Sequence, residues 1–263
     1  MTRVLSVSPD DYASHPLHAQ DRVWTETSCS VDVWIEVLHT LGLAPTAALG
    51  FTLSGDLVGD QWRFLKFPPE DLRDLFGIAV DELVPWGSLP EHIERALAAG
   101  RLLTIEVDTY FLPDTLGRGY REAHGKSTIV PNLIDRTARR LEYFHNTGYH
   151  ALSGEDYDGL FAGPGLPPYV EIIRLDRLDR SDPIKRAHRV AQAHLARRPA
   201  DNPVARLGAL LERDLADLAQ QDFETFHRYV FGTIRQCGAN AELAAAFAEW
   251  LGAESTAFTS VAA

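Results

Sequence analysis

The order of apolar periodicities along the chain limits its fold more than any other feature of the sequence. Residues 29–42 repeat apolar side chains with the period of a deeply buried helix. Residues 127–134 and 140–145 read as two strands joined by a short turn, which indicates an antiparallel pair. Beyond Tyr169 the pattern predicts helices, over 183–198, 202–220, 222–236 and 241–251. A helix, then strands, then a helical block together predict an α+β fold.

A segment rich in glycine and proline, Gly163–Pro168, has the composition of a linker. It predicts a division into residues 1–162, which hold the strands, and residues 169–263, a helical C-terminal region packed on them. The chain has 263 residues, of which 45% are hydrophobic, enough to bury a substantial core.

Charge and cysteine content exclude several classes of protein. The net charge is −12, which argues against nucleic acid as a partner because such proteins carry a basic field. Two cysteines and histidines without ligand spacing predict no metal site and a reduced, cytoplasmic protein. The sequence also lacks an apolar run of the ~20 residues that a membrane span needs.

Cys29 stands where the first predicted helix begins. The free N–H groups and the dipole at a helix N-terminus stabilise a thiolate and can hold an oxyanion. This placement makes Cys29 a candidate nucleophile. The alternative is a cysteine that packs as a small buried hydrophobic residue.

Two polar residues could complete a catalytic set with Cys29. His124 precedes one strand of the predicted pair, where it could act as the base, and Asn146 ends the other, where it could orient the imidazole. The alternatives are a surface histidine and an asparagine that serves the turn before Gly148. His145 competes for the role of base, although strand alternation turns it away from Asn146. The order Cys, His, Asn along a helix and a strand pair is that of papain-like enzymes.

The segments TETSCSVDVWIEVLHTLGL, KFPPEDLRDLFGI, IEVDTYFLPDTLGRGYREAH, YFHNTGY and RQCGANAELAAAFAEWL resemble an uncharacterised bacterial family. Its members commonly sit beside amino acid:carrier protein ligases. The order Cys, D-x-Y-x-L-P, His also resembles the acyltransferases of butirosin biosynthesis, over roughly residues 25–150. That resemblance implies a papain-like fold and transfer of an aminoacyl group from the phosphopantetheine thioester of a carrier protein to an amine.

The second resemblance implies that Cys29 is the nucleophile and His124 the base, with Asn146 in the third position. One departure concerns the oxyanion hole, since Glu26 lies where such enzymes have a glutamine donor. The donors would then be the Cys29 N–H and a hydroxyl of Thr27 or Ser28. Asp32, one turn into the helix, would oppose thiolate formation.

Glu106, Asp108 and Tyr110 share one face of a predicted strand because side chains alternate along it. Either acid could bind the ammonium group of an aminoacyl substrate, and the family resemblance runs through Asp108. Trp24 could form a wall of the same site. The alternative is a solvated strand face and a tryptophan of the core.

One segment of the acidic chain is basic. Residues 171–198 hold eight Lys or Arg and four Asp or Glu, a net charge of +4. Arg186, Arg189 and Arg197 on the predicted helix could dock an acidic carrier protein, or they could be its solvated side.

The sequence thus predicts a cysteine-dependent aminoacyl transferase that works through an S-acyl enzyme. It would bind no cofactor of its own, because the carrier protein supplies the phosphopantetheine arm. Its partners would be an aminoacyl carrier protein and, further, an amino acid:carrier protein ligase. The alternatives are a papain-like hydrolase acting on peptides, amides or thioesters, and a non-catalytic module that binds the carrier protein.

Overall fold

The main sheet collects strands from three separate stretches of the chain. The computed structural model describes residues 2–19, 22, 24–162 and 168–253. Its seven strands pair antiparallel in the order β4-β9-β5-β6-β7-β8, and β1 pairs with β6. They are β1 (Thr2–Arg3), β4 (Ala79–Leu83), β5 (Leu102–Asp108), β6 (Lys126–Asp135), β7 (Arg140–His145), β8 (Gly148–Ser153) and β9 (Val170–Arg174). The expected antiparallel pairing of the strands around 127–134 and 140–145 is confirmed.

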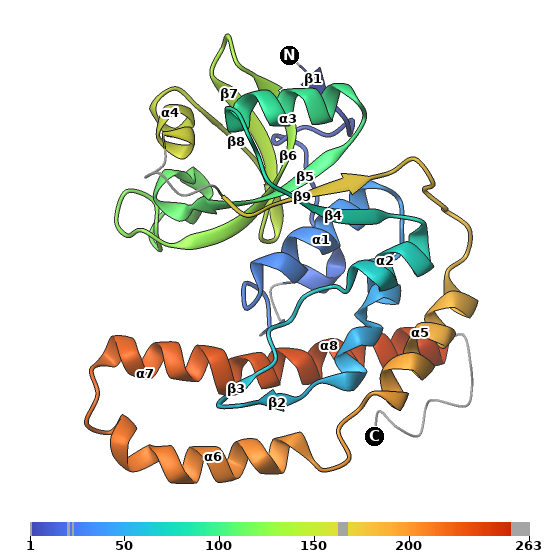
Figure 1. The fold of residues 1–263 in the computed structure, drawn as a ribbon, viewed down its shortest axis with the longest axis vertical. Coiled ribbons are helices and arrows are strands. Elements are labelled where there is room, and N and C mark those ends of the chain that lie inside the picture. Colours follow the sequence, from blue (N-terminus) through green and yellow to red (C-terminus); the bar gives the residue numbers. More distant parts are fainter. Residues whose placement is uncertain (1, 20–21, 23, 163–167, 254–263) are drawn as a thin grey trace.

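Helix α1 (Cys29–Thr40) lies at the centre of the molecule, between the sheet and the C-terminal helices (Figure 1). Every residue from Ser30 to Leu38 is buried, as its wide apolar face predicts. Other helices before the linker are η1 (Pro16–His18), η2 (Pro45–Ser54), α2 (Pro69–Phe76), α3 (Leu89–Ala98), η3 (Thr109–Phe111), η4 (Pro113–Thr115) and α4 (Glu155–Phe161). A separate hairpin joins β2 (Leu57–Val58) to β3 (Gln61–Trp62).

The C-terminal region is helical and shares the core of the sheet. Val190 of α5 and Phe247 of α8 are buried in the same cluster as Ile129 of β6. The helices of this region are α5 (Ile184–Ala196), α6 (Pro203–Leu218), α7 (Phe223–Val230), the π-helix η5 (Phe231–Arg235) and α8 (Gln236–Ala253). The fold is therefore mixed α+β, with an antiparallel sheet and a helical C-terminal region that packs against η2, α2 and the β2–β3 hairpin.

Helices α7 and α8 continue one another through η5 as a single long element (Figure 1). The π segment and the residue after it bind the loop that leads into α1. The Arg235 guanidinium donates to the Thr27 hydroxyl at 3.0 Å, and the Gln236 amide donates to the Thr27 carbonyl at 3.0 Å. The C-terminal region thus holds the chain two residues before Cys29.

Two segments differ from the expectation. The chain after the linker forms a strand first, since β9 lies between β4 and β5; residues 163–167 of the linker are outside the described residues. Residues 49–53, whose apolar run also predicts a strand, belong to the 3₁₀ helix η2. Helices α5 and α8 pack against η2, whose helical turns satisfy the backbone without a neighbouring strand.

Candidate active site

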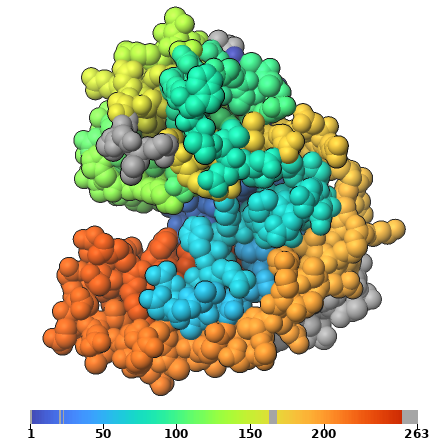
Figure 2. Space-filling model, viewed as in Figure 1, coloured from blue at the N-terminus to red at the C-terminus, as the bar shows by residue number. Residues whose placement is uncertain are grey.

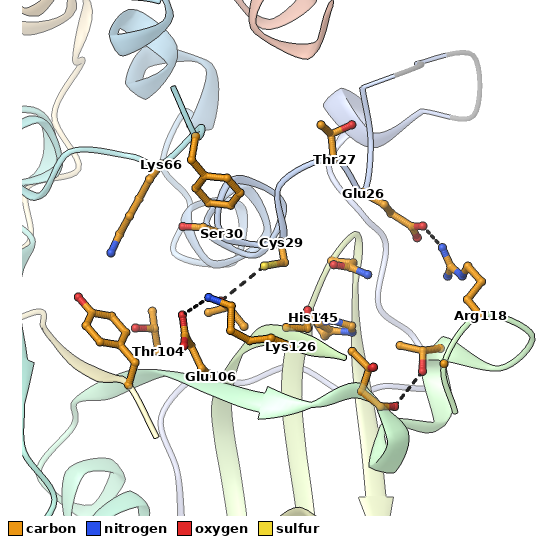
Figure 3. A pocket seen from close by; sticks show the side chains of 18 of the residues that line it. Glu26, Thr27, Cys29, Ser30, Lys66, Thr104, Glu106, Arg118, Lys126 and His145 are labelled. Atoms are coloured by element: carbon orange, nitrogen blue, oxygen red, sulfur yellow. Dashed lines mark hydrogen bonds and ion pairs between the residues drawn. The ribbon is translucent and has the colours of Figure 1, made fainter. Parts of the chain in front are cut away.

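A pocket of ≈ 430 Å³ opens where the first turn of α1 faces strands β5 and β6. The space-filling view shows the molecule hollowed between the sheet lobe and the orange-red C-terminal helices (Figure 2). Cys29 lines the pocket from the helix, and His145 lines it from the end of β7 (Figure 3). Phe231 of the π-helix contributes a further part of the wall. Three parts of the fold therefore build one site.

Cys29 is the first residue of α1, as the sequence predicts. Ser28 is the N-cap, and its hydroxyl accepts from the Val31 N–H at 3.5 Å. The N–H groups of Cys29 and Ser30 have no acceptor within the helix, because they belong to its first turn. The Cys29 side chain is half-buried, and its Sγ lies 3.6 Å from the Thr128 hydroxyl. The thiol and two free N–H donors therefore stand together at the helix terminus.

His145 is fully buried and is held at both ring nitrogens. Its Nδ1 hydrogen-bonds to an Asp114 carboxylate oxygen, and its Nε2 lies 2.6 Å from the Ser127 hydroxyl. An ionised carboxylate accepts only, so Nδ1 carries the proton and the lone pair is on Nε2. The Ser127 hydroxyl therefore donates to Nε2, which is the basic nitrogen on the pocket side.

Asp114 fixes the position of the His145 ring through its bond to Nδ1. Burial alone would raise the pKa of Asp114, but the hydrogen bond and charge of His145 outweigh it and the net shift is downward. The Tyr143 hydroxyl donates to the other carboxylate oxygen, which holds the group in place. Asp114 is thus a charged acceptor that sets the tautomer of His145, as the third member of a catalytic triad does.

The structure places the two candidate histidines differently. His124 has an exposed side chain, bonds to Asp108 Oδ2 at 2.6 Å and stacks on the Tyr110 ring at 4.5 Å. It precedes β6 in a loop outside the pocket wall, whereas His145 ends the neighbouring strand beside the pocket. The difference arises because β6 begins only at Lys126, so the loop before it carries His124 away from α1.

Asn146 lines the pocket, but another residue orients the imidazole. It forms the two-residue turn between β7 and β8 with Thr147, and its φ of 45° suits the left-handed conformation that asparagine tolerates. The residue that binds Nδ1 of His145 is Asp114.

The predicted substrate-binding residues separate into two groups. Glu106 lines the pocket and binds Lys126 at 2.7 Å, and Thr27 also lines it. Asp108 instead caps η3 and binds His124, outside the pocket wall. Tyr110 stacks on His124, Trp24 is buried against His18 with ring centres 5.2 Å apart, and Ser28 is occupied as the N-cap.

Two residues argued against catalysis in the sequence, Glu26 and Asp32, and each is paired with another side chain in the structure. Glu26 is ion-paired with Arg118, and the hydroxyl of Ser28 donates to the Leu65 carbonyl at 2.6 Å, so neither supplies a donor to the pocket. The N–H groups of Cys29 and Ser30 are the donors that remain at the helix terminus. Burial raises the pKa of Asp32, and its Oδ1 bonds to Nε2 of His18 at 3.2 Å, so the carboxyl group has a partner of its own within the core.

The predicted docking arginines line a surface groove beside α5. Arg186, Arg189 and Arg197 line it together with the acidic side chains of Glu70, Asp71 and Asp74, and Arg186 is ion-paired with Asp179. A cavity of ≈ 290 Å³ shares Arg197 with the groove and Lys66 with the Cys29 pocket. The cavity therefore borders both the groove and the pocket.

The sequence patterns do not identify three residues of the site, which are Asp114, Ser127 and Lys66. Each acquires its place from pairing between strands or from a loop that folds back on the sheet, and local periodicity contains neither. The sequence D-x-Y-x-L-P ends one residue before Asp114, which is the single local signal near it.

Replacing Asp114 by asparagine should lower the free energy of unfolding at pH 7 by about 2 kcal/mol, because a buried charged hydrogen bond is lost. The pKa of Asp114 is lowered in the folded protein, so its contribution is present above its unfolded pKa of about 3.9. It disappears as the pH falls through the lower folded value. Denaturant unfolding from pH 7 to pH 3 should therefore show the two proteins converging below about pH 4. A difference that stays constant over this range would contradict the assignment.

Metal sites and membrane-spanning helices are the other features to consider. Among the described residues, no group of three or more His, Cys, Asp or Glu side chains could hold a metal ion. None of the described helices is both long and apolar enough to cross a membrane.

Comparison with known proteins identifies both parts of the chain. Residues 13–175 match the model of the DUF1839 N-terminal domain, and residues 180–263 match that of the DUF1839 C-terminal domain. A search of the curated proteins gave no match. Since the two models together span most of the chain, it belongs to the DUF1839 family.

Proposed function

We propose that this protein is a cysteine-dependent acyltransferase in which Cys29 is the nucleophile and His145 the general base. The observation that carries the proposal is that one pocket holds a cysteine at a helix N-terminus and a histidine backed by a buried carboxylate. These are the parts that activate a thiol and receive its proton. A cysteine helix against an antiparallel sheet that carries the histidine is also the layout of a papain-like fold, which we propose for the region before the linker together with β9, the strand after it that completes the sheet.

Ser127 is the competing nucleophile, because its hydroxyl already bonds to Nε2 of His145. Its backbone is paired with Val107 within the sheet, so it has no free N–H beside it to hold an oxyanion. Cys29 has its own N–H and that of Ser30. Cys29 is also half-buried, whereas Ser127 is almost completely covered. The helix terminus is therefore the better place for attack on a carbonyl.

The reaction follows from these positions. His145 takes the proton of Cys29, the thiolate attacks the thioester carbonyl, and the oxyanion is held by the first-turn N–H groups. The carbon–sulfur bond to the donor breaks, and His145 returns the proton to the departing thiolate. An amine then attacks the S-acyl enzyme, gives its proton to His145, and Cys29 recovers it. Each proton is returned, so no cofactor is required.

We propose an aminoacyl group as the acyl group, with Glu106 as the acceptor for its ammonium. Glu106 faces the pocket, and its partner Lys126 is 70% exposed, so the pair is easily exchanged for a ligand cation. Asp108 does not serve this role, because its oxygens are taken by His124 and by the N–H groups of Tyr110 and Gly125.

The proposed donor is an aminoacyl carrier protein, loaded by an amino acid:carrier protein ligase. The exposed Arg189 and Arg197 of the groove would receive its acidic surface, and the neighbouring cavity, lined by Arg197 and Lys66, would take the phosphopantetheine arm. Support comes from the place of this cavity, which borders both the groove and the Cys29 pocket, and from the exposed charge of Arg189.

Mixing the protein with an aminoacyl carrier protein and measuring intact mass tests the proposal directly. We expect a covalent adduct of the mass of the acyl group on the protein, and its loss when an acceptor amine is added. Release of the free amino acid without an acceptor would instead identify a hydrolase. A complex without any acyl loss would identify a binding module, and either result would reject the transferase.

Docking predicts a dependence on charge. Replacing Arg189 and Arg197 by glutamate should slow transfer from the carrier protein about tenfold, because these exposed charges act on the association rate. Transfer from a small thioester should not change, and higher ionic strength should slow the unmodified protein in the same way. Lys185→Glu is the matched control, since Lys185 is exposed on α5 and does not line the groove. Equal slowing by the control would reject the groove as the docking site.

A further inference from the structure

Four side chains in the Cys29 pocket form a cluster that the proposed chemistry does not use. The Glu171 carboxylate accepts from Lys66 Nζ at 2.7 Å, from the Tyr169 hydroxyl at 2.9 Å and from the Thr104 hydroxyl at 2.9 Å. All four side chains line the same pocket as Cys29. Lys66 reaches across from the helix side toward the strand wall that carries Thr104 (Figure 3).

The donors and acceptors of this cluster are unevenly used. Glu171 is 8% exposed and has one oxygen bound to two donors and the other to one, so little acceptor capacity is left. Lys66 gives one of its three N–H donors to Glu171, and its side chain is 39% exposed to the pocket. Burial would lower the pKa of Lys66, but the hydrogen bond and charge of Glu171 outweigh it and raise it. The cluster therefore presents a permanent cation with unused donors.

This ion pair is unlike the one at Glu106. Lys126 is 70% exposed and can leave Glu106 freely, whereas Glu171 is fixed by three donors and holds Lys66 in one position. The Lys66 ammonium is also 5.3 Å from the centre of the Tyr169 ring, which restricts it further. A fixed donor is suited to recognising a group of defined position on a ligand.

The rest of the pocket wall disfavours a long hydrocarbon chain. Among the described side chains that line it, Phe64 and Phe231 are apolar, and most others carry hydroxyl or charged groups. An alkyl chain would cover these polar groups without replacing their hydrogen bonds to water, which is costly. A ligand with an oxygen acceptor near Lys66 would keep the unused donors of that ammonium hydrogen-bonded.

We propose that Lys66, positioned by Glu171, Tyr169 and Thr104, binds a carbonyl oxygen at the far end of the acyl group. The acyl group would thus end in a carboxylate or a carboxamide, which share this oxygen. The inference rests on the proposed function, because it concerns the group that Cys29 receives.

A series of N-acetylcysteamine thioesters with equal chain length tests the subsite. The acyl groups are glutaryl, its terminal amide glutaramyl, and 5-methylhexanoyl, which has the same shape without the terminal oxygens. We expect the rate constant for adduct formation at Cys29 to be about tenfold higher for the two acyl groups with a terminal oxygen. The reason is the charged hydrogen bond to Lys66, which 5-methylhexanoyl cannot form. Glutaryl faster than glutaramyl identifies a carboxylate, and equal rates identify a neutral carbonyl.

Lys66→Met keeps the length of the side chain and removes the ammonium. It should abolish the preference by lowering the rates of the oxygen-bearing groups to that of 5-methylhexanoyl, and Lys66→Arg should restore part of the preference. Lys185→Met is the control and should keep the preference, because Lys185 is exposed on α5 and does not line this pocket. Equal rates for all three thioesters in the unmodified protein, or equal loss of all three in Lys66→Met, would overturn the subsite. Absence of any Cys29 adduct would reject the proposed function itself.

Discussion

Replacing His145 by alanine should lower the rate of acyl transfer by about 10²–10⁴-fold, the usual contribution of a general base. His145 lines the Cys29 pocket, and in the neutral imidazole the bond from Nδ1 to Asp114 leaves the lone pair on Nε2. Without His145, the thiol proton loses its proposed acceptor. The measurement is the rate of S-acyl adduct formation with a small thioester, which avoids any effect of carrier docking.

His124→Ala is the matched control. Its side chain is 72% exposed and bonds to Asp108, so its loss should change the rate by less than about twofold. Because His145 is buried, the unfolding midpoint of each variant must be measured alongside the rate. A folded His145→Ala protein with the original rate would contradict the assignment, and a large loss in His124→Ala would return the base to that residue.

Cys29→Ala should abolish the acyl adduct entirely while the protein stays folded. The substitution removes the only atom that forms the proposed covalent bond, and alanine keeps the helix start because Ser28 provides the cap. Intact mass after incubation with a thioester measures the adduct. An adduct of equal yield in Cys29→Ala would instead place the acyl group on another nucleophile, with Ser127 the first to examine.

Selective alkylation provides an independent reading of the same thiol. Burial raises the pKa of Cys237, whereas Cys29 stands at a helix N-terminus that favours the thiolate. Iodoacetamide at neutral pH should therefore label Cys29 first, as peptide mapping would show. Equal labelling of the two cysteines would mean that the helix terminus does not activate Cys29.

Local sequence was sufficient to place Cys29 and the strand pair. The cap at Ser28 and the apolar face of α1 are contained within a dozen residues, and the turn between β6 and β7 is equally local. The histidine could not be chosen in the same way. His145 meets Asp114 across 31 residues, and alternation along β7 says which face it takes but not which element covers that face.

Local sequence was also insufficient to predict the last two strands at one side of the sheet, β4 and β9. Strand β4 has the sequence AVDEL, and its side chains are half-buried or exposed because it is an edge strand. Strand β9 follows the linker and is identified only by its partners, β4 and β5. Both strands result from long-range pairing, so periodicity within a short window does not reveal them.

The contacts from the π-helix to Thr27 have a consequence for engineering. Arg235 and Gln236 hold the residue two positions before Cys29, and Phe231 closes part of the pocket. The region matching the C-terminal family model therefore forms part of the Cys29 pocket and of its support. A chimera that joins the two regions from different relatives should recover activity only if Thr27 and Arg235 are inherited as a matched pair.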